Sequence, residues 1–155
     1  MNGSRRRLLL RTAPLAAASA ALAQTKSPAA KSAKVKRVYY PDGAKGSSEI
    51  PLYSEVVSHG DTVYVSGHGV NTTADVRKQT AAVLERIEKC LQSAGSSMRN
   101  ALKCNVYLRH LEDYAAMNEV YRGRFGPEPP VRTCVAVAGI PLDGCLVEIE
   151  VIAAI

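Results

Sequence analysis

The chain has 155 residues, a length that fits one domain, and its 46% hydrophobic and 22% charged residues are enough for a globular core. It contains no run of 18 apolar residues that could cross a membrane as a helix. The formal net charge is +6, but residues 1–37 hold nine basic residues and no acidic one. Subtracting those nine from 20 leaves 11 basic against 14 acidic residues, a net charge of −3, so the body of the chain lacks the basic surface of a nucleic-acid binder.

The first 23 residues have the organisation of a signal peptide. Ser4–Leu9 (SRRRLL) resembles a twin-arginine export signal, an Ala/Leu stretch follows, and Ala21–Ala23 fits a small-x-small cleavage site. We therefore predict export to the periplasm. The arginines and the lack of acidic residues also fit a mitochondrial transit peptide, and a disordered cytoplasmic tail is a third reading. Residues 24–36, rich in Lys, Ala, Ser and Pro, predict a disordered linker, which leaves 37–155 as the folded domain.

The pattern of apolar residues in that domain predicts the element order βββαβαββ. Strands are expected at 36–40, 52–60, 62–67 and 101–109, with helices over 74–94 and 111–125. The alternating residues of 130–150 predict a closing β-hairpin. This order is typical of an α+β domain, a mixed sheet with two helices packed on one face.

The first helix has the clearest signal. Six residues fall on one helical face: Val76, Thr80, Val83, Leu84, Ile87 and Leu91. Asn71, Thr72 and Thr73 are candidate N-caps, and Gly95 ends the helix.

The four cysteines give no sign of a metal centre or a disulfide. Cys90, Cys104, Cys134 and Cys145 include no C-x-x-C pair, and the three histidines stand at no ligand spacing, so a zinc site is not expected. In the predicted hairpin, Cys145 would face a residue near Ala138 and not Cys134, which disfavours a disulfide between the two cysteines. Buried free thiols are expected.

The last two predicted strands carry charged residues among small ones. The Arg132 guanidinium can bind a carboxylate through two parallel hydrogen bonds, and Glu148 can position a water and move its proton. The plainer reading is a surface ion pair of Arg132 with Glu148 or Glu150, worth about 0–1 kcal/mol. Glu150 by itself reads as a solvated charge at the rim of a site.

Four strings together resemble the RidA/YjgF family of imine and enamine deaminases: LYSEVVSHGDTVYVSG, LERIEKCLQSAGSS, NVYLRHLEDYAAMNEVYRGRF and PPVRTCVAVAGIPLDGCLVEIEVIA. The resemblance runs over residues 37–155. It implies a chorismate-mutase-like YjgF fold and a homotrimer with three ligand clefts between subunits. It also implies hydrolysis of reactive 2-imino and enamine acids to 2-keto acids and ammonia, without metal or cofactor. The expected partners are the small 2-imino or 2-keto acid and further copies of the chain, with no nucleic acid and, for the mature protein, no membrane.

The resemblance also assigns site residues by position. It makes Arg132 the carboxylate-binding residue and Glu148 the residue that holds the attacking water. Four further residues match positions that line the cleft: Tyr53, Ser66, Asn118 and Cys134. The residues alone allow plainer roles: strand packing for Tyr53, a cap or buried hydrogen bond for Ser66 and Asn118, and a packing thiol for Cys134.

The chain departs from the family pattern close to these positions. Pro51 and Leu52 stand where the family usually has Gly-Pro, and His68 stands where it commonly has Gln, so His68 is either a turn or a cleft residue. The segment that follows is shorter than usual, and the last hairpin is one residue longer before Glu148. Two other functions remain open: a non-catalytic module that binds 2-keto acids, and a ribonuclease, which the net charge of the body disfavours.

Overall fold

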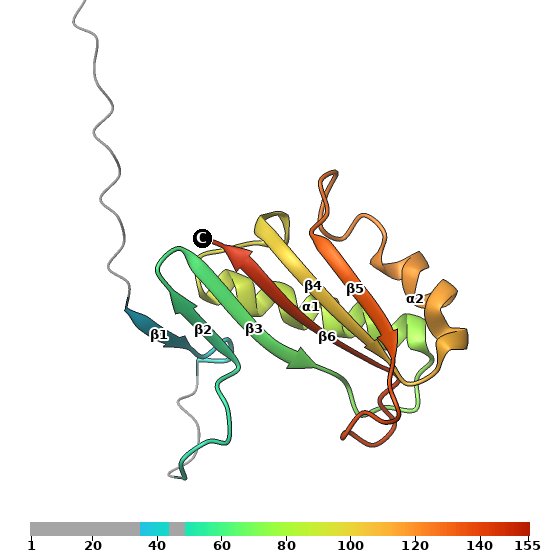
Figure 1. Ribbon diagram of the computed structural model, residues 1–155. Helices are drawn as coiled ribbons and strands as arrows, with labels where there is room; N and C mark the ends of the chain where they lie inside the picture. Colours follow the sequence, from blue (N-terminus) through green and yellow to red (C-terminus); the bar gives the residue numbers. More distant parts are fainter. Residues whose placement is uncertain (1–34, 44–48) are drawn as a thin grey trace, which may run out of the picture. The chain divides into compact units, whose positions relative to one another are not determined.

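The computed structural model describes residues 35–43 and 49–155 (Figure 1). The predicted leader and nearly all of the predicted linker lie outside the described residues. The elements follow the predicted order: β1 (Lys36–Tyr39), β2 (Val56–His59), β3 (Thr62–His68), α1 (Val76–Ser93), β4 (Ala101–Leu108), α2 (Tyr114–Tyr121), β5 (Val131–Ala136) and β6 (Val147–Ala154). Within the described ranges, no helix is both long and apolar enough to span a membrane.

The strands form one sheet in the order β1-β2-β3-β6-β4-β5. Neighbouring strands are antiparallel except β4 and β5, which run parallel. Both helices lie on the same face of this sheet (Figure 1). The prediction of a mixed sheet with two helices on one face is confirmed.

The predicted hairpin over 130–150 is wrong. Strand β4 lies between β5 and β6, so that Cys104 pairs with Arg132 on one side and with Val151 on the other. The reason is the crossover from β4 through α2 to β5, which returns the chain parallel to β4 and places β5 at the edge. Alternation identified both strands, but it carries no information on which neighbour each one pairs with. All four cysteines are free, as expected.

Helix α1 supplies most of the helical side of the core. The six residues of its predicted inner face are all buried, and they pack with buried residues of β3, β4 and β6. The N-cap is Asp75, whose side chain accepts from Lys78 N at 3.0 Å, and not one of the three predicted residues. Gly95 ends the helix as predicted, because its φ of 78° suits the left-handed turn in which Ser96 N donates to Leu91 O.

Candidate functional site

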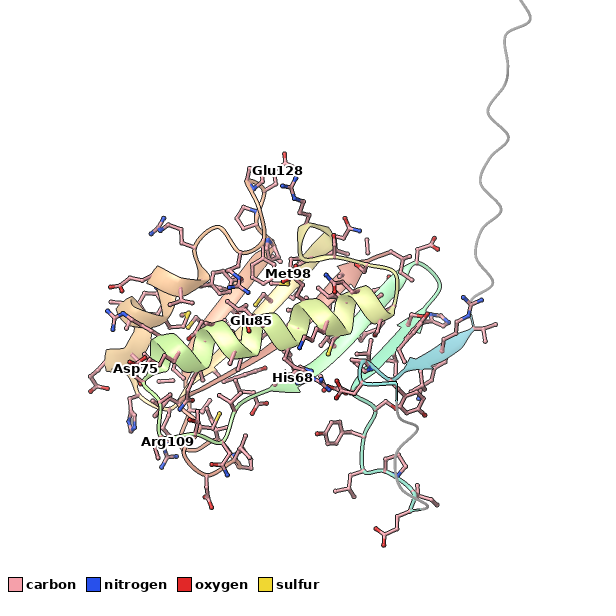
Figure 2. The ribbon with its side chains drawn as sticks, turned by 180° about the vertical axis from the view of Figure 1, so that it is seen from behind. His68, Asp75, Glu85, Met98, Arg109 and Glu128 are labelled. Carbon is pink, nitrogen blue, oxygen red and sulfur yellow. The ribbon has the colours of Figure 1, made fainter. Side chains whose placement is uncertain are left out.

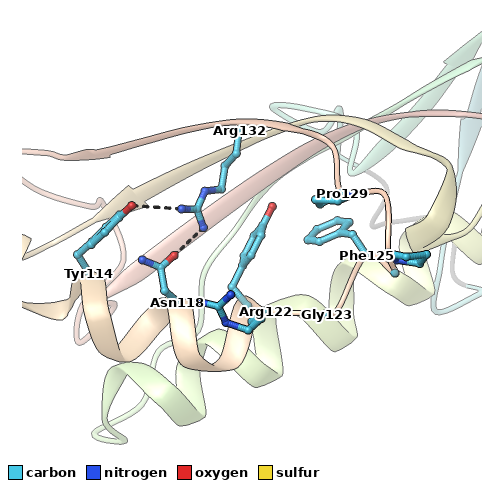
Figure 3. Close-up of a pocket in the computed structure, with 10 residues that line it drawn as sticks. Tyr114, Asn118, Arg122, Gly123, Phe125, Pro129 and Arg132 are labelled. Atoms are coloured by element: carbon cyan, nitrogen blue, oxygen red, sulfur yellow. Dashed lines mark hydrogen bonds between the residues drawn. The ribbon is translucent and has the colours of Figure 1, made fainter.

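Arg132 extends from edge strand β5 toward α2 (Figure 3). Its Nη1 donates to Asn118 Oδ1 at 2.7 Å, and its Nη2 lies 3.4 Å from the Tyr114 hydroxyl. Its guanidinium carbon lies 4.6 Å from the centre of the Tyr121 ring, a cation–π contact. Positions 114, 118 and 121 share one face of a helix, so α2 alone fixes the direction of the guanidinium.

A cavity of about 530 Å³ opens beside this guanidinium. Besides Arg132 and its three contacts on α2, it is lined by Arg122, Gly123, Phe125, Gly126, Pro127 and Pro129. Arg132 forms no ion pair with a carboxylate of the described residues, and the alternative pairing with Glu148 or Glu150 is not found. Two of its five N–H groups are engaged, so its charge and the other donors are available to a ligand.

Glu148 lies on the other face of the sheet. Residues paired across neighbouring strands point to the same face, and Arg132 pairs with Cys104, a buried residue of the helix-covered core. Glu148 pairs with Tyr107, three positions further along β4, and side chains alternate along a strand. Glu148 therefore points away from the helices, and one strand separates it from Arg132.

A β-bulge holds Glu148 in place. Val65 pairs with Val151 and His68 with Ile149, so that two residues of β3, Ser66 and Gly67, stand opposite a single residue of β6. The Glu148 side chain lies against Gly67, where an added Cβ would collide with the carboxylate. The hydroxyl of Ser66, the other bulge residue, is buried and has no hydrogen-bond partner among the described residues.

Glu150 occupies the same open face but is not the solvated rim charge of the plainer reading. Its Oε1 accepts from Asn105 Nδ2 at 2.6 Å and from the Tyr107 hydroxyl at 3.1 Å. It also lines a second, smaller cavity of about 240 Å³, together with Ser66.

The remaining two predicted site residues are Cys134 and Tyr53, and they lie in different parts of the fold. Cys134 shares the helix face with Arg132, and its partly buried thiol packs against the core. Burial raises the pKa of this thiol, which keeps it neutral, as the packing reading expects. Tyr53 lies in the segment before β2 and is 69% exposed, next to the fully exposed Leu52.

The structure thus gathers five of the six predicted site residues into two groups and leaves Tyr53 outside both. Arg132, Asn118 and Cys134 belong to the group on the helix face, which we call the arginine half. Ser66 and Glu148 belong to the group on the open face, which we call the glutamate half. Within one chain the two halves point in opposite directions.

Sequence reasoning missed three residues that shape these halves. Tyr114 and Tyr121 share the helical spacing of Asn118, and that spacing could have revealed them. The third is Gln79, a fully buried polar residue on the apolar face of α1. Its Nε2 donates to Gly144 O at 2.8 Å and its Oε1 accepts from Leu146 N at 2.8 Å, so it fixes the loop that leads into β6.

The fold is an α+β sheet that carries an arginine beside a small cavity on one face and a glutamate against a glycine bulge on the other. The family model described as endoribonuclease L-PSP matches residues 47–155. The chain belongs to this family, which is also called the YjgF or RidA family, and the predicted family resemblance is confirmed.

Individual relatives support the assignment over most of the domain. A RutC family protein of Pyrococcus abyssi is 37% identical over 116 residues, which cover 70% of this chain and 91% of that protein. Protein mmf2, mitochondrial, of Schizosaccharomyces pombe is 37% identical over 66% of this chain and 86% of its own. The crystal structure of Escherichia coli TdcF with bound serine has a TM-score of 0.67 and 32% identity, with 77% of this chain and 98% of that chain covered.

Proposed function

We propose that the protein is a cofactor-independent hydrolase that converts reactive 2-imino and enamine acids to 2-keto acids and ammonia. The observation that carries the proposal is Arg132, a guanidinium without a carboxylate partner among the described residues, held by α2 at the wall of a small cavity. Such a group suits the carboxylate of a small 2-imino acid. TdcF, a relative, was solved with serine, which also carries a carboxylate and a nitrogen on the neighbouring carbon.

The reaction needs few groups because an imine carbon is already open to attack by water. Glu148 accepts a proton as the water oxygen bonds to C2 and the C=N electron pair moves to nitrogen. Glu148 then returns the proton to nitrogen, which gives a carbinolamine. Glu148 next takes the proton of the new hydroxyl group and passes it to the same nitrogen, so that the C–N bond breaks as the C=O bond forms and the products are the 2-keto acid and ammonia. Arg132 orients the substrate carboxylate throughout.

Arg132 and Glu148 can act on one substrate only if the site is shared between chains. We propose a homotrimer in which the arginine half of one copy faces the glutamate half of the next, which gives three clefts. Exposed apolar side chains support such contacts: Ile50, Leu52 and Tyr53 before β2, Leu102 on β4, and Val131 on β5. Light scattering should give about three times the monomer mass, and a monomer would leave the site incomplete.

The direct test is release of 2-keto acid from a freshly generated 2-imino acid by the purified protein. Acceleration over the spontaneous hydrolysis supports the enzyme. Binding of 2-keto acids through Arg132 without any acceleration supports the alternative of a non-catalytic binding module.

Ribonuclease activity is a second candidate, because the matching family is described as an endoribonuclease. The net charge of −3 on the body of the chain disfavours a large phosphate-binding surface. Binding to single-stranded RNA that weakens steeply as salt rises would support this candidate.

For localisation we propose export through the twin-arginine-like leader. Transit to mitochondria is the alternative, and relatives named as mitochondrial in two yeasts favour it. Residues 1–30 fused to a reporter that is active only outside the cytoplasm should report, and replacing Arg5 and Arg6 by lysine should silence the reporter. A signal that survives the double replacement argues against the twin-arginine route.

A further inference from the structure

Three metal-ligating side chains converge beside α1, outside the two halves of the candidate site. They are Glu55 from the segment before β2, His68 from the end of β3, and Cys90 from α1. Cys90 Sγ lies 3.4 Å from His68 Nε2 and 3.7 Å from Glu55 Oε1, and the last two atoms lie 3.7 Å apart. Figure 2, drawn from the helix side, shows His68 next to this helix.

The β-bulge explains why His68 reaches this place. With regular alternation, a residue three positions after the buried Val65 would point to the open face. The extra residue at Ser66–Gly67 reverses the alternation, so that His68 points to the helix side. His68 therefore lies in β3 and is not the turn residue that the sequence suggested, and the three donors are too far apart in sequence to form a recognisable ligand spacing.

The triangle of donor atoms has the dimensions of a zinc site. Tetrahedral Zn²⁺ takes sulfur at about 2.3 Å and nitrogen or oxygen at about 2.0–2.2 Å, which puts the sulfur roughly 3.5–3.7 Å from the other two donors and the nitrogen roughly 3.3–3.5 Å from the oxygen. The observed Cys90–His68, Cys90–Glu55 and His68–Glu55 separations of 3.4, 3.7 and 3.7 Å differ from these ranges by at most about 0.2 Å. An ion can therefore contact all three donors without a rearrangement of the backbone.

The donor set also suits zinc, which binds imidazole nitrogen, thiolate sulfur and carboxylate oxygen. An ion that binds the Cys90 sulfur would displace the thiol proton. The His68 side chain is 12% exposed and that of Glu55 28%, so the donors are reachable from solvent.

Arg86, which is not itself a ligand, binds the Glu55 carboxylate. It donates from Nε to Glu55 Oε1 at 2.7 Å and from Nη1 to Asp42 Oδ1 at 2.7 Å. With zinc bound, Zn²⁺ and Arg86 would carry +3 against −3 from the two carboxylates and the Cys90 thiolate, so the group would be neutral. Arg86 donates to the same oxygen, Oε1, that faces His68 and Cys90. Zinc binding therefore requires rotation of the Glu55 carboxylate, so that zinc takes one oxygen and Arg86 the other, a common role for an outer partner of a metal ligand.

We propose that Glu55, His68 and Cys90 form a zinc-binding site, with water as the fourth ligand. The site would fix the end of β3 directly after the bulge that packs against Glu148. It requires neither the proposed reaction nor a second copy of the chain.

Cobalt titration of the untagged, full-length, metal-free protein tests this site, because Co²⁺ shares the preferred ligands of zinc and reports thiolate coordination by an intense near-ultraviolet band. We expect one equivalent of Co²⁺ to produce this charge-transfer band together with visible bands of the intensity typical of four-coordinate cobalt. Addition of zinc should abolish the near-ultraviolet band and the visible bands. Cys90→Ala should remove the charge-transfer band, and His68→Gln should weaken binding on the order of a hundredfold. Cys145→Ala, which removes another buried thiol, should keep both the band and the affinity.

No thiolate band in the wild type, or the same band in Cys90→Ala, would overturn the proposal. If Cys90→Ala does not fold, His68→Gln and Glu55→Gln decide the question, and unchanged cobalt affinity in both would overturn it. Zinc should also raise the melting temperature of the wild type by several degrees and that of His68→Gln much less. An equal shift in the two proteins would mean binding elsewhere and would contradict the site.

Discussion

Arg132 and Glu148 lie in unlike surroundings. Arg132 stands on an edge strand, faces the helices and is held by side chains of α2, whereas Glu148 stands on an inner strand, faces away from the helices and rests against the backbone of Gly67. The arginine half is organised within one chain, while the glutamate half lies on an open face. Under the proposed function, this difference predicts that ligand binding and proton transfer are separable by mutation and that each half supplies only part of the active site.

The largest effect is expected from removal of the guanidinium. Arg132→Ala should abolish measurable turnover, whereas Arg132→Lys keeps the charge but loses the planar fork and should lower kcat/KM about tenfold to a hundredfold. The melting temperature should stay nearly unchanged, because Arg132 is in no ion pair among the described residues. Arg124→Ala, in the loop after α2, is the matched control. Unfolding of Arg132→Ala with normal activity per folded molecule would show that the arginine is structural.

Mutation of the glutamate half should lower kcat and leave the affinity for 2-keto acids nearly unchanged. Glu148→Gln should leave 2-keto acid affinity near the wild-type value and lower kcat on the order of a hundredfold to ten-thousandfold, because an amide cannot accept the proton of water. Single-turnover kinetics and calorimetric titration measure the two quantities. Glu150→Gln is the comparison, since Glu150 shares the face but is engaged with Asn105 and Tyr107. Equal losses in kcat for the two variants would contradict the assigned role of Glu148.

The hydrogen bonds of Gln79 to the loop before β6, which we call the clamp, can be tested by measuring the free energy of unfolding. Gln79→Ala leaves Gly144 O and Leu146 N without their partner and opens space in the core, so the free energy of unfolding should fall by about 2–4 kcal/mol. Gln92→Ala, on the exposed side of α1, should change it by less than about 0.5 kcal/mol. Urea denaturation measures both values, and similar small losses would show that the clamp contributes little.

The smallest effect is expected where α2 positions the guanidinium. Asn118→Ala removes a 2.7 Å hydrogen bond and should weaken 2-keto acid binding about fivefold to tenfold, in line with about 1 kcal/mol. Tyr114→Phe removes only a 3.4 Å contact and should change binding less than Asn118→Ala does. Calorimetric titration of both variants measures the two losses of 2-keto acid affinity. A larger loss in Tyr114→Phe than in Asn118→Ala would mean that Tyr114, and not Asn118, directs Arg132.

The sequence predicted what depends on local pattern and missed what depends on pairing between strands. The inner face of α1, its end at Gly95 and the order of the elements follow from spacing along the chain, and the family strings led to Arg132 and Glu148. The position of β4 between β5 and β6 is a non-local choice of partner, so the predicted hairpin failed. One inserted residue at Ser66–Gly67 turned His68 to the helix side, and a bulge of this kind leaves no mark in an alternating pattern.

Complementation between two inactive variants tests the shared site most directly. Arg132→Ala and Glu148→Gln should each be inactive alone, but in mixed trimers an intact arginine half from one variant can meet an intact glutamate half from the other. Random mixing by co-expression or by refolding together should restore activity to about one quarter of the wild-type value per cleft. If mixed oligomers form, as mass measurement shows, and activity stays at the level of the separate variants, then Arg132 and Glu148 do not meet across two chains and the account of the site is wrong.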